Sequence, residues 1–546
     1  MNKWITLVHS GPIFPKDYVY VGFDKNLSTL AEEMLYHYSA KVGTDYINSV
    51  FNKNFYKALK PELNSQYKLK KFPEDFSDLF ITMNKFREDN KGKNTLSVED
   101  KEAIKEKYGY ATLNGDRQPI ASPYIESAGI FCGRGKNGNN GAWKYKVNPE
   151  DCIINATNHK DIEAPYSKWK DHVENKNSFE LVSYSIRLST GRILNKKIMF
   201  APTSIVKQTS DKNKFKKAYS LIENWNMVSD YIYIGMLSKD KHTRQCASAS
   251  FLIKELGIRV GDEKDEDLAD TKGATTLCKD NIELKDNTIY LSFLGKDSVL
   301  FENHLVVSPE IYFVFQNLLS YPTDQLFPFI CSSDVDNYLG QCLEGLTAKV
   351  FRTAYGSSLL AEGLKNIKCK DNEKVLEFNR VNLKVAQKLN HQKQVGKTYK
   401  EKNTELKENV VNLKRVYADT KEKYTRLIDE TSIKIKKINS KKLSKKDKDS
   451  LKSLHTKNKE RYESMIEKAK NKLTEAEIKY KIKVETKNTA LGTSKANYSD
   501  PRIIFSWCQD NNVNPDKVYS KSLQEKFNWA KDVVADFYKT YPTIKE

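Results

Sequence analysis

The stretch EKNTELKENVVNLKRVYADTKEKYTRLIDE, residues 401–430, decides the architecture of this 546-residue chain. It lies in a segment between Gly396 and Gly492 that contains neither glycine nor proline, so nothing in it interrupts a helix. Apolar residues recur there at helical spacing but are sparse, and the pattern lapses around residues 439–442. The segment therefore predicts two antiparallel helices with a narrow apolar seam, each about 50–60 Å long at ~1.5 Å per residue.

The same segment carries much of the chain's positive charge. Residues 401–490 contain 26 Lys and Arg against 15 Asp and Glu, a net charge of +11 out of +20 for the whole chain. Such a surplus indicates a polyanionic partner, and composition alone leaves DNA, RNA and an anionic membrane open. A solvated helical pair without any partner would show the same composition.

Other compositional features narrow the class of protein. The chain has no apolar run long enough to span a membrane, and its N-terminus lacks the apolar core of a signal peptide. Its eight cysteines are scattered singly, a spacing that fits neither a zinc site nor a disulfide framework. We therefore expect a soluble protein of a reducing, intracellular compartment without membrane contact.

Upstream of the long segment the pattern is mixed α+β. Residues 179–200 and 288–301 alternate between apolar and polar as two hairpins, and the second places Lys296 at its turn. A helix that ends at Gly257 leaves Arg259 just beyond its last turn. A further helical pattern, residues 346–353, sets Lys349 and Arg352 three residues apart on one face.

The chain carries no P-loop, no dinucleotide-binding glycine motif, no hydrolase serine motif and no cluster of metal-binding carboxylates. Any chemistry is therefore expected to use cationic side chains directly. Each candidate also has a simpler explanation, since Arg259 alone would be a cation that stabilises a helix C-terminus. The chain contains 30 tyrosines, so an arbitrary tyrosine is far more often structural than catalytic.

Four strings nevertheless match one known family, in order and in their placement around the long helical segment. They are Phe293–Ser298, Leu346–Thr353, Asn390–Gln392 and Leu491–Arg502. On these strings the chain resembles the eukaryotic type IB DNA topoisomerases along nearly its whole length.

The resemblance implies a catalytic role for five residues. Tyr498 would be the nucleophile, forming a 3′-phosphotyrosine and freeing a 5′ hydroxyl. Arg259, Arg352 and His391 would bind the non-bridging phosphate oxygens, and Lys296 would protonate the leaving 5′ oxygen. The charge that develops on phosphate suits guanidinium donors, and cations make a tyrosine with a free pKa of ~10 a better nucleophile. The resemblance implies no cofactor and no metal.

The resemblance also implies contacts to double-stranded DNA near the cleavage site. The residues that match such family positions are Arg134, Lys144, Asp297, Lys349, Asn390 and Asn497. We expect the chain to act as a monomer inside the cell, in the nucleus or at a site of cellular or viral DNA replication or transcription.

The expected architecture is an α+β, bilobed DNA clamp with a mainly helical catalytic lobe, a protruding antiparallel coiled-coil linker and a small helical C-terminal domain. Its expected boundaries are a cap lobe at 1–175, the catalytic core at 176–397, the linker at 398–490 and the nucleophile-bearing domain at 491–546.

Two alternatives stay open at this stage. Tyrosine site-specific recombinases use a similar residue set, although they carry a His-x-x-Arg element where this chain has Lys349 to Arg352. A non-catalytic DNA-binding scaffold would also explain the charge.

Overall fold

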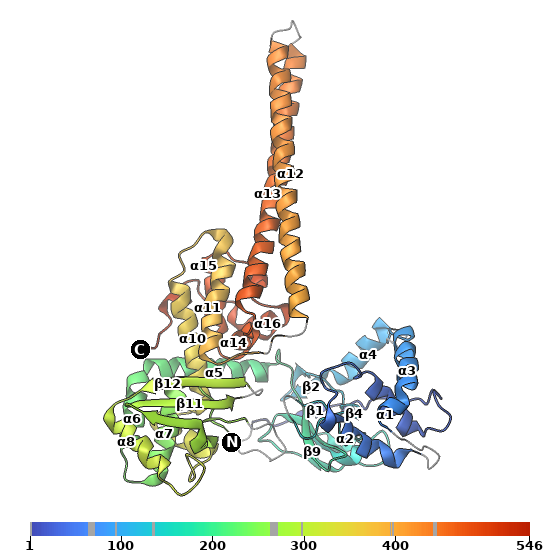
Figure 1. Ribbon diagram of the computed structural model, residues 1–546, viewed down its shortest axis with the longest axis vertical. Coiled ribbons are helices and arrows are strands. Elements are labelled where there is room, and N and C mark those ends of the chain that lie inside the picture. The colour runs from blue at the N-terminus through green and yellow to red at the C-terminus, as the bar shows by residue number, and fades with distance from the viewer. Residues whose placement is uncertain are drawn as a thin grey trace.

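The computed structural model describes residues 3–63, 71–92, 96–133, 137–261, 271–295, 299–393, 395, 398–439 and 445–545. These residues form an α+β protein with many helices and several small sheets, as the sequence predicts. Figure 1 shows the N-terminal sheets with α1–α4 on one side, the elements α5–α11 on the other, and two long helices that project away from both.

Among the described residues up to residue 200, the strands form three small sheets. One has the order β1-β2-β3, formed by Leu7–His9, Tyr110–Leu113 and Asp116–Pro119. The largest has the order β7-β6-β8-β9, formed by β6 Cys152–Asn155, β7 Asp171–Val173, β8 Glu180–Arg187 and β9 Ile193–Met199. The third pairs β4, Gly129–Ile130, with β5, Trp143–Lys144. Strands β8 and β9 pair in antiparallel, which confirms the hairpin predicted for residues 179–200.

Four helices accompany these sheets: α1 Thr29–Ser39, α2 Ser49–Leu59, α3 Ser77–Asp89 and α4 Val98–Tyr108. Aromatic side chains of α1, α2 and α3 share a hydrophobic cluster in which Tyr38, Phe55 and Phe80 are buried. A separate cluster under the sheets surrounds Trp4 and Trp169. The N-terminal part therefore has cores of its own, distinct from the core of the rest of the chain.

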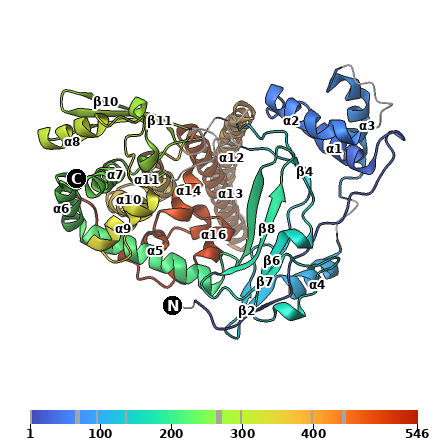
Figure 2. The ribbon, with the colours of Figure 1, turned by 90° about the horizontal axis from the view of Figure 1, so that it is seen from below.

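Helix α5, Ile205–Glu223, leads from the N-terminal sheets into the second group of elements (Figure 2). That group contains α6 Trp225–Met236, α7 Lys241–Leu256, α8 Pro309–Leu319, α9 Ser332–Cys342, α10 Ala348–Lys365 and α11 Lys374–Lys388. It also contains an antiparallel sheet of β10 Ile282–Lys285, β11 Thr288–Gly295 and β12 Val299–Val306. Side chains along β11 alternate between buried and exposed, and β11 pairs with β12 up to Gly295 opposite Val299. The predicted hairpin of residues 288–301 is thus confirmed on both sides of its turn.

The long segment forms two helices of 41 residues each, α12 Tyr399–Asn439 and α13 Lys445–Glu485. They pack side by side and project from the body (Figure 1). Among their described side chains, the buried hydrophobic ones are Val410 and Ala476, so the apolar seam is as narrow as expected. Polar contacts supplement it, such as Tyr424 Oη to Glu463 Oε1 at 3.0 Å.

The residues just before α12 and just after α13 lie next to each other at the base of the helical pair. Gln392 and Thr489 form an antiparallel bridge, and the Lys393 amide donates to the Asn488 carbonyl at 2.9 Å. The segments that lead into α12 and out of α13 are therefore joined by hydrogen bonds.

The remaining helices are α14 Leu491–Asn497, α15 Pro501–Asp510, α16 Lys521–Lys526 and α17 Phe537–Thr540. Their apolar side chains join the same core as α5–α11, where for example the rings of Phe378 and Trp507 lie 5.2 Å apart. In the described part of the chain, no helix is long and apolar enough to cross a membrane.

Candidate active site

Helix α10 carries two of the cations of the site and packs against the segment of Tyr498. Its first turns carry Lys349, which is exposed, and Arg352, which is 4% exposed. Gly356 and Ser357 follow one turn later on the same helix, and both lie against the segment that carries Tyr498. One rigid element therefore positions cations and tyrosine together.

The guanidinium of Arg352 is oriented by the ends of two other helices. It donates to the carbonyl of Gly257, which ends α7 in a left-handed conformation at φ +63°, and to the carbonyl of Leu389 at 2.9 Å, just after α11. Its Nε is buried and has no hydrogen-bond partner among the described residues. Burial lowers the pKa of Arg352, although an arginine stays protonated at physiological pH.

His391 is placed by the turn that follows α11. Asn390 adopts φ +51°, a left-handed conformation that asparagine tolerates, and this lets the His391 amide donate to the Ala386 carbonyl at 2.8 Å. The imidazole is buried, with Nε2 3.4 Å from Arg352 Nη2. Burial, with the charges of Arg352 and Arg259 adding to it, lowers the pKa of His391 to about 3. The imidazole is therefore neutral near pH 7, and its buried Nδ1 has no partner among the described residues.

The backbone of Tyr498 rests directly on α10. A methyl group at Gly356 would lie 2.6 Å from the Tyr498 carbonyl oxygen, so only glycine permits this approach. Ser357 Oγ donates to the same oxygen at 3.2 Å and accepts from the Asp500 amide at 3.0 Å. Asp500 is fully buried and binds Arg502 through both carboxylate oxygens, at 3.1 and 2.7 Å. These contacts hold the tyrosine segment from both sides.

The Tyr498 ring lies against both His391 and Arg352. Its centroid is 5.2 Å from that of His391, and Arg352 Cζ lies 4.9 Å from it. Burial by itself raises the pKa of the Tyr498 hydroxyl, but the charges of Arg352 and Arg259, joined by Lys349, outweigh burial and lower the pKa below its ordinary value of 10.0. A phenol whose phenolate is stabilised in this way is a better nucleophile at neutral pH.

Two cavities open at this cluster. The larger, of about 750 Å³, is lined by Arg259, Arg352, Tyr498, Lys349 and Asn497 among others. The smaller, of about 100 Å³, is lined by Arg259, Arg352, Asn390 and His391, and reaches Gly295 at the end of β11. Arg259 and Tyr498, which are 239 positions apart in the sequence, thus face a common cavity.

The structure brings together four of the five residues expected to be catalytic, Arg259, Arg352, His391 and Tyr498. Lys296 lies outside the described residues, although the strands on either side of it lead to the smaller cavity. Of the expected DNA contacts, Lys349, Asn390 and Asn497 line these cavities. Arg134 and Asp297 also lie outside the described residues.

Lys144 is not part of this cluster. It lies on β5 in the N-terminal part, where its ammonium pairs closely with Glu126. Lys196 shares that carboxylate at 3.5 Å.

Sequence reasoning missed the supporting residues Gly356, Ser357 and Asp500. The small pair Gly356-Ser357 in the middle of a helix was an available signal, because glycine inside a helix often marks a close approach of another backbone. Nothing local marks Asp500 as buried. Within the described residues, no group of three or more His, Cys, Asp or Glu is arranged to hold a metal ion, and the expectation of a metal-free reaction stays a prediction.

The site thus places a buried tyrosine with a lowered pKa beside arginines and a neutral histidine. Comparison with known families identifies the class of protein to which this site belongs. Residues 2–193 match the DNA binding fragment of eukaryotic DNA topoisomerase I, residues 203–424 match its catalytic core, and residues 470–539 match the C-terminal topoisomerase domain. The chain belongs to the eukaryotic DNA topoisomerase I family.

Individual relatives agree with this assignment. The chain is 30% identical over 570 residues to DNA topoisomerase 1 of Homo sapiens, covering 98% of this chain and 72% of the human protein. It is 32% identical over 585 residues to DNA topoisomerase 1 of Caenorhabditis elegans, covering 97% and 67% respectively. For DNA topoisomerase 1 alpha of Arabidopsis thaliana the identity is 31% over 569 residues, and the chain spans only 59% of that protein. These matches favour a type IB topoisomerase over a tyrosine recombinase or a scaffold.

Proposed function

We propose that this chain relaxes supercoiled double-stranded DNA by cutting one strand through Tyr498, letting the duplex rotate, and resealing the strand without ATP or a metal. The observation that carries the proposal is the environment of Tyr498. This tyrosine is buried beside Arg352 and His391, and the pKa of its hydroxyl is lowered. An ordinary core tyrosine such as Tyr519 shows the opposite, since burial raises its pKa well above the ordinary value.

The proposed reaction is a transesterification. Tyr498 Oη bonds to phosphorus as its proton passes to water, and the bond from phosphorus to the 5′ oxygen breaks. The 5′ oxygen takes a proton from Lys296, which leaves a 3′-phosphotyrosine and a free 5′ hydroxyl. Religation runs these steps in reverse, so the energy of the broken bond stays in the phosphotyrosine and no ATP is required.

Arg259, Arg352 and His391 would act on the non-bridging oxygens. Negative charge collects on these oxygens in the transition state, and each preorganised donor typically contributes about 10²–10³ in rate. On this proposal phosphate oxygens would accept from Arg352 Nε and from His391 Nδ1 in its protonated tautomer, because neither nitrogen has a partner among the described residues. A neutral His391 donates a hydrogen bond without the cost of placing a third positive charge in the cluster.

The DNA would lie between the N-terminal sheets and the α5–α11 group, as in a bilobed clamp. On this proposal residues 1–175 form the cap lobe, 176–397 the catalytic core, 398–490 a coiled-coil linker and 491–546 the domain that delivers Tyr498. The separate hydrophobic clusters support the division of an N-terminal part from the core. Strands β8 and β9, which follow residue 175, belong to the N-terminal sheet and cluster, so this division is supported nearer residue 200 than residue 175. The shared core of α10, α11 and α15 supports firm docking of the last segment.

Further DNA contacts are assigned to Arg134, Lys144, Asp297, Lys349, Asn390 and Asn497. Lys349, Asn390 and Asn497 are supported by their place on the cavity walls. A phosphate at Lys144 would have to compete with Glu126, so we assign Lys144 a weaker contribution. Binding through phosphates predicts weak sequence preference and strong salt dependence. We further propose that the chain acts as an intracellular monomer.

The test is relaxation of supercoiled plasmid in EDTA without ATP, followed by trapping of covalent protein–DNA adducts. Tyr498→Phe should abolish both relaxation and adduct formation while DNA affinity changes little, because only the nucleophilic oxygen is lost. Tyr519→Phe is a matched control, since its hydroxyl is also buried and has no partner among the described residues.

Each alternative has its own outcome. Binding without relaxation by the wild type would identify a scaffold. Strand exchange that requires a specific site, without relaxation of ordinary plasmid, would identify a recombinase. Adducts on another residue in Tyr498→Phe would overturn the assignment of the nucleophile.

A further inference from the structure

A partly buried polar bridge connects helix α5 to the segment that carries Tyr498. Lys526, at the end of α16, donates from Nζ to the carbonyl of Ala496 at 2.9 Å, two residues before the tyrosine. The same ammonium lies 3.6 Å from Asp211 Oδ2 on α5. Asp211, Lys526 and Tyr498 all line the larger cavity. The carboxylate of α5 therefore reaches the backbone of the nucleophile segment through a single lysine.

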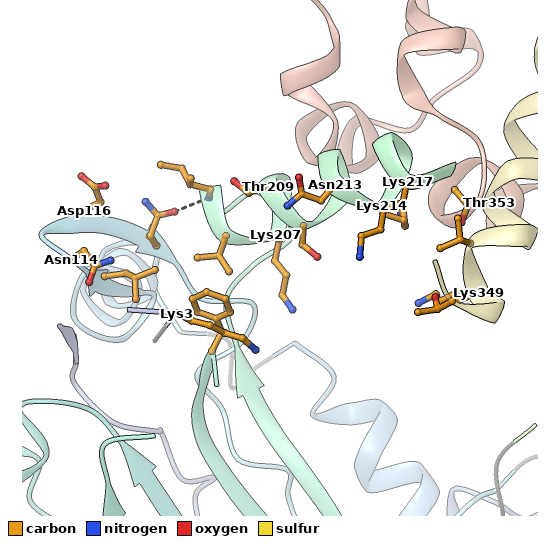
Figure 3. Close-up of a pocket in the computed structure, with 18 residues that line it drawn as sticks. Lys3, Asn114, Asp116, Lys207, Thr209, Asn213, Lys214, Lys217, Lys349 and Thr353 are labelled. Carbon is orange, nitrogen blue, oxygen red and sulfur yellow. Dashed lines mark hydrogen bonds between the residues drawn. The ribbon is translucent and has the colours of Figure 1, made fainter. Parts of the chain in front are cut away.

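Asp211 stands between two ammonium groups. Its Oδ1 pairs with Lys214 at 2.9 Å while its Oδ2 faces Lys526, and the three side chains are 15–22% exposed. Figure 3 shows Lys214 on α5 and Lys349 on α10, which also line a second cavity that extends to residues of the N-terminal part such as Asn114 and Asp116. Burial lowers the pKa of Lys214, opposed by Asp211 and reinforced by the charges of Lys526 and Lys349. Without the carboxylate, these cations would repel one another at close range.

The C-terminal segment also contacts α5 at points that do not involve this bridge. Aromatic contacts hold it on α5 further along the helix, with Phe215 and Trp529 at 6.3 Å and Tyr219 and Tyr541 at 5.3 Å between ring centroids. Loss of the bridge should therefore leave the segment bound and shift only its local position near Ala496.

We propose that Asp211 is a positioning residue for Tyr498: it holds Lys526 against the Ala496 carbonyl and so sets the distance of the nucleophile from the phosphate-binding arginines. The inference rests on the proposed function, because it concerns the attack of Tyr498 on DNA. It assigns to α5, the helix between the two groups of elements, a part in chemistry as well as in connection.

The test compares Asp211→Asn with Glu475→Gln in the full chain, on a DNA substrate that releases its 5′ fragment so that cleavage is followed for one turnover. Glu475 is a matched control because it also binds a lysine of the C-terminal segment, Lys517 at 3.2 Å, but on the exposed surface. A displacement of a few tenths of an ångström should slow cleavage by Asp211→Asn roughly five- to thirtyfold at saturating DNA. Glu475→Gln should stay within twofold of the wild type.

A role in positioning differs from a role in folding in what it changes. Misplacement lowers the rate constant of cleavage, whereas partial unfolding lowers the fraction of enzyme that cleaves. Lys526→Gln should slow cleavage to a similar degree, and the Asp211→Asn, Lys526→Gln double variant should be no slower than the slower single variant. Asp211→Glu, which keeps the charge, should recover most of the rate.

Several results would overturn the inference. One is an unchanged rate constant in both Asp211→Asn and Lys526→Gln. Another is a smaller fraction of enzyme that cleaves, with an unchanged rate constant. A third is weaker and less salt-dependent DNA binding with a normal cleavage rate at saturating DNA, which would make Lys526 a DNA contact. A wild-type chain that forms no adduct would instead contradict the proposed function itself.

Discussion

Gly356→Ala tests whether the close packing of the Tyr498 backbone against α10 controls the rate of cleavage. The added methyl group would lie 2.6 Å from the carbonyl oxygen of Tyr498 and 2.9 Å from both its carbonyl carbon and its Cβ. These are backbone atoms and the root of the side chain, so rotation of a flexible group cannot relieve the contact. An ordinary separation of about 3.4 Å requires the tyrosine segment to move by roughly 0.5–0.8 Å.

A shift of this size should act on catalysis more than on stability. Misplacement of a reacting group by about 1 Å can cost 10²-fold, so we expect single-turnover cleavage to fall roughly 30- to 100-fold. Overpacking costs about 1–3 kcal/mol of unfolding free energy, and the better helix propensity of alanine offsets up to ~1 kcal/mol of it. DNA affinity should change little because Arg259 and Lys349 keep their places.

The assay is the cleavage rate on the same DNA substrate used for Asp211, together with a thermal melt. Gly340→Ala in α9 is the control, because a methyl group there meets nothing closer than 3.9 Å and should be neutral or slightly stabilising. Cleavage by Gly356→Ala within threefold of the wild type, with an unchanged melt, would refute the argument that this packing positions the nucleophile.

Three further predictions concern the acid, the histidine and the long helices. Lys296→Ala should slow cleavage, and a substrate with a 5′ sulfur leaving group should restore most of the rate, because such a group needs no proton; lack of rescue would leave Lys296 a positioning role. The pKa of His391 is about 3 in the folded chain and about 6.5 in the unfolded chain. Below pH 6.5 the unfolded chain therefore binds a proton that the folded chain does not, and the free energy of unfolding falls by up to ~1.4 kcal/mol for each pH unit. Denaturant unfolding at pH 7 and pH 5 should therefore show a smaller loss in His391→Gln than in the wild type, and equal losses would contradict a buried neutral imidazole. Replacing residues 401–484 with a short Gly-Ser loop should keep the single-turnover cleavage rate within about tenfold of the wild type, because Gln392 and Thr489 already pair at the base of the two helices. Plasmid relaxation should become more distributive and more sensitive to salt. Loss of cleavage in a folded variant would show that the long helices position Tyr498.

Local features were within reach of the sequence. The absence of glycine and proline over nearly a hundred residues predicts the long helices, and the alternation before Gly295 predicts the hairpin that leads to Lys296. The end of α7 at Gly257 was likewise predictable, because a left-handed residue closes a helix most readily when it is glycine. The family resemblance named Arg259, Arg352, His391 and Tyr498 before any of them could be placed.

Only the tertiary structure decided how those residues act on one another. The pKa of Tyr498 depends on the balance between burial and the approach of Arg352 and Arg259, and both are set by packing between segments far apart in the chain. Gly356 and Asp211 matter because of backbone and charged groups that only the folded chain brings near them. Periodicity and capping report interactions within a few residues of one another, whereas Coulomb energies and steric contacts depend on distance in space, which the order of residues does not contain.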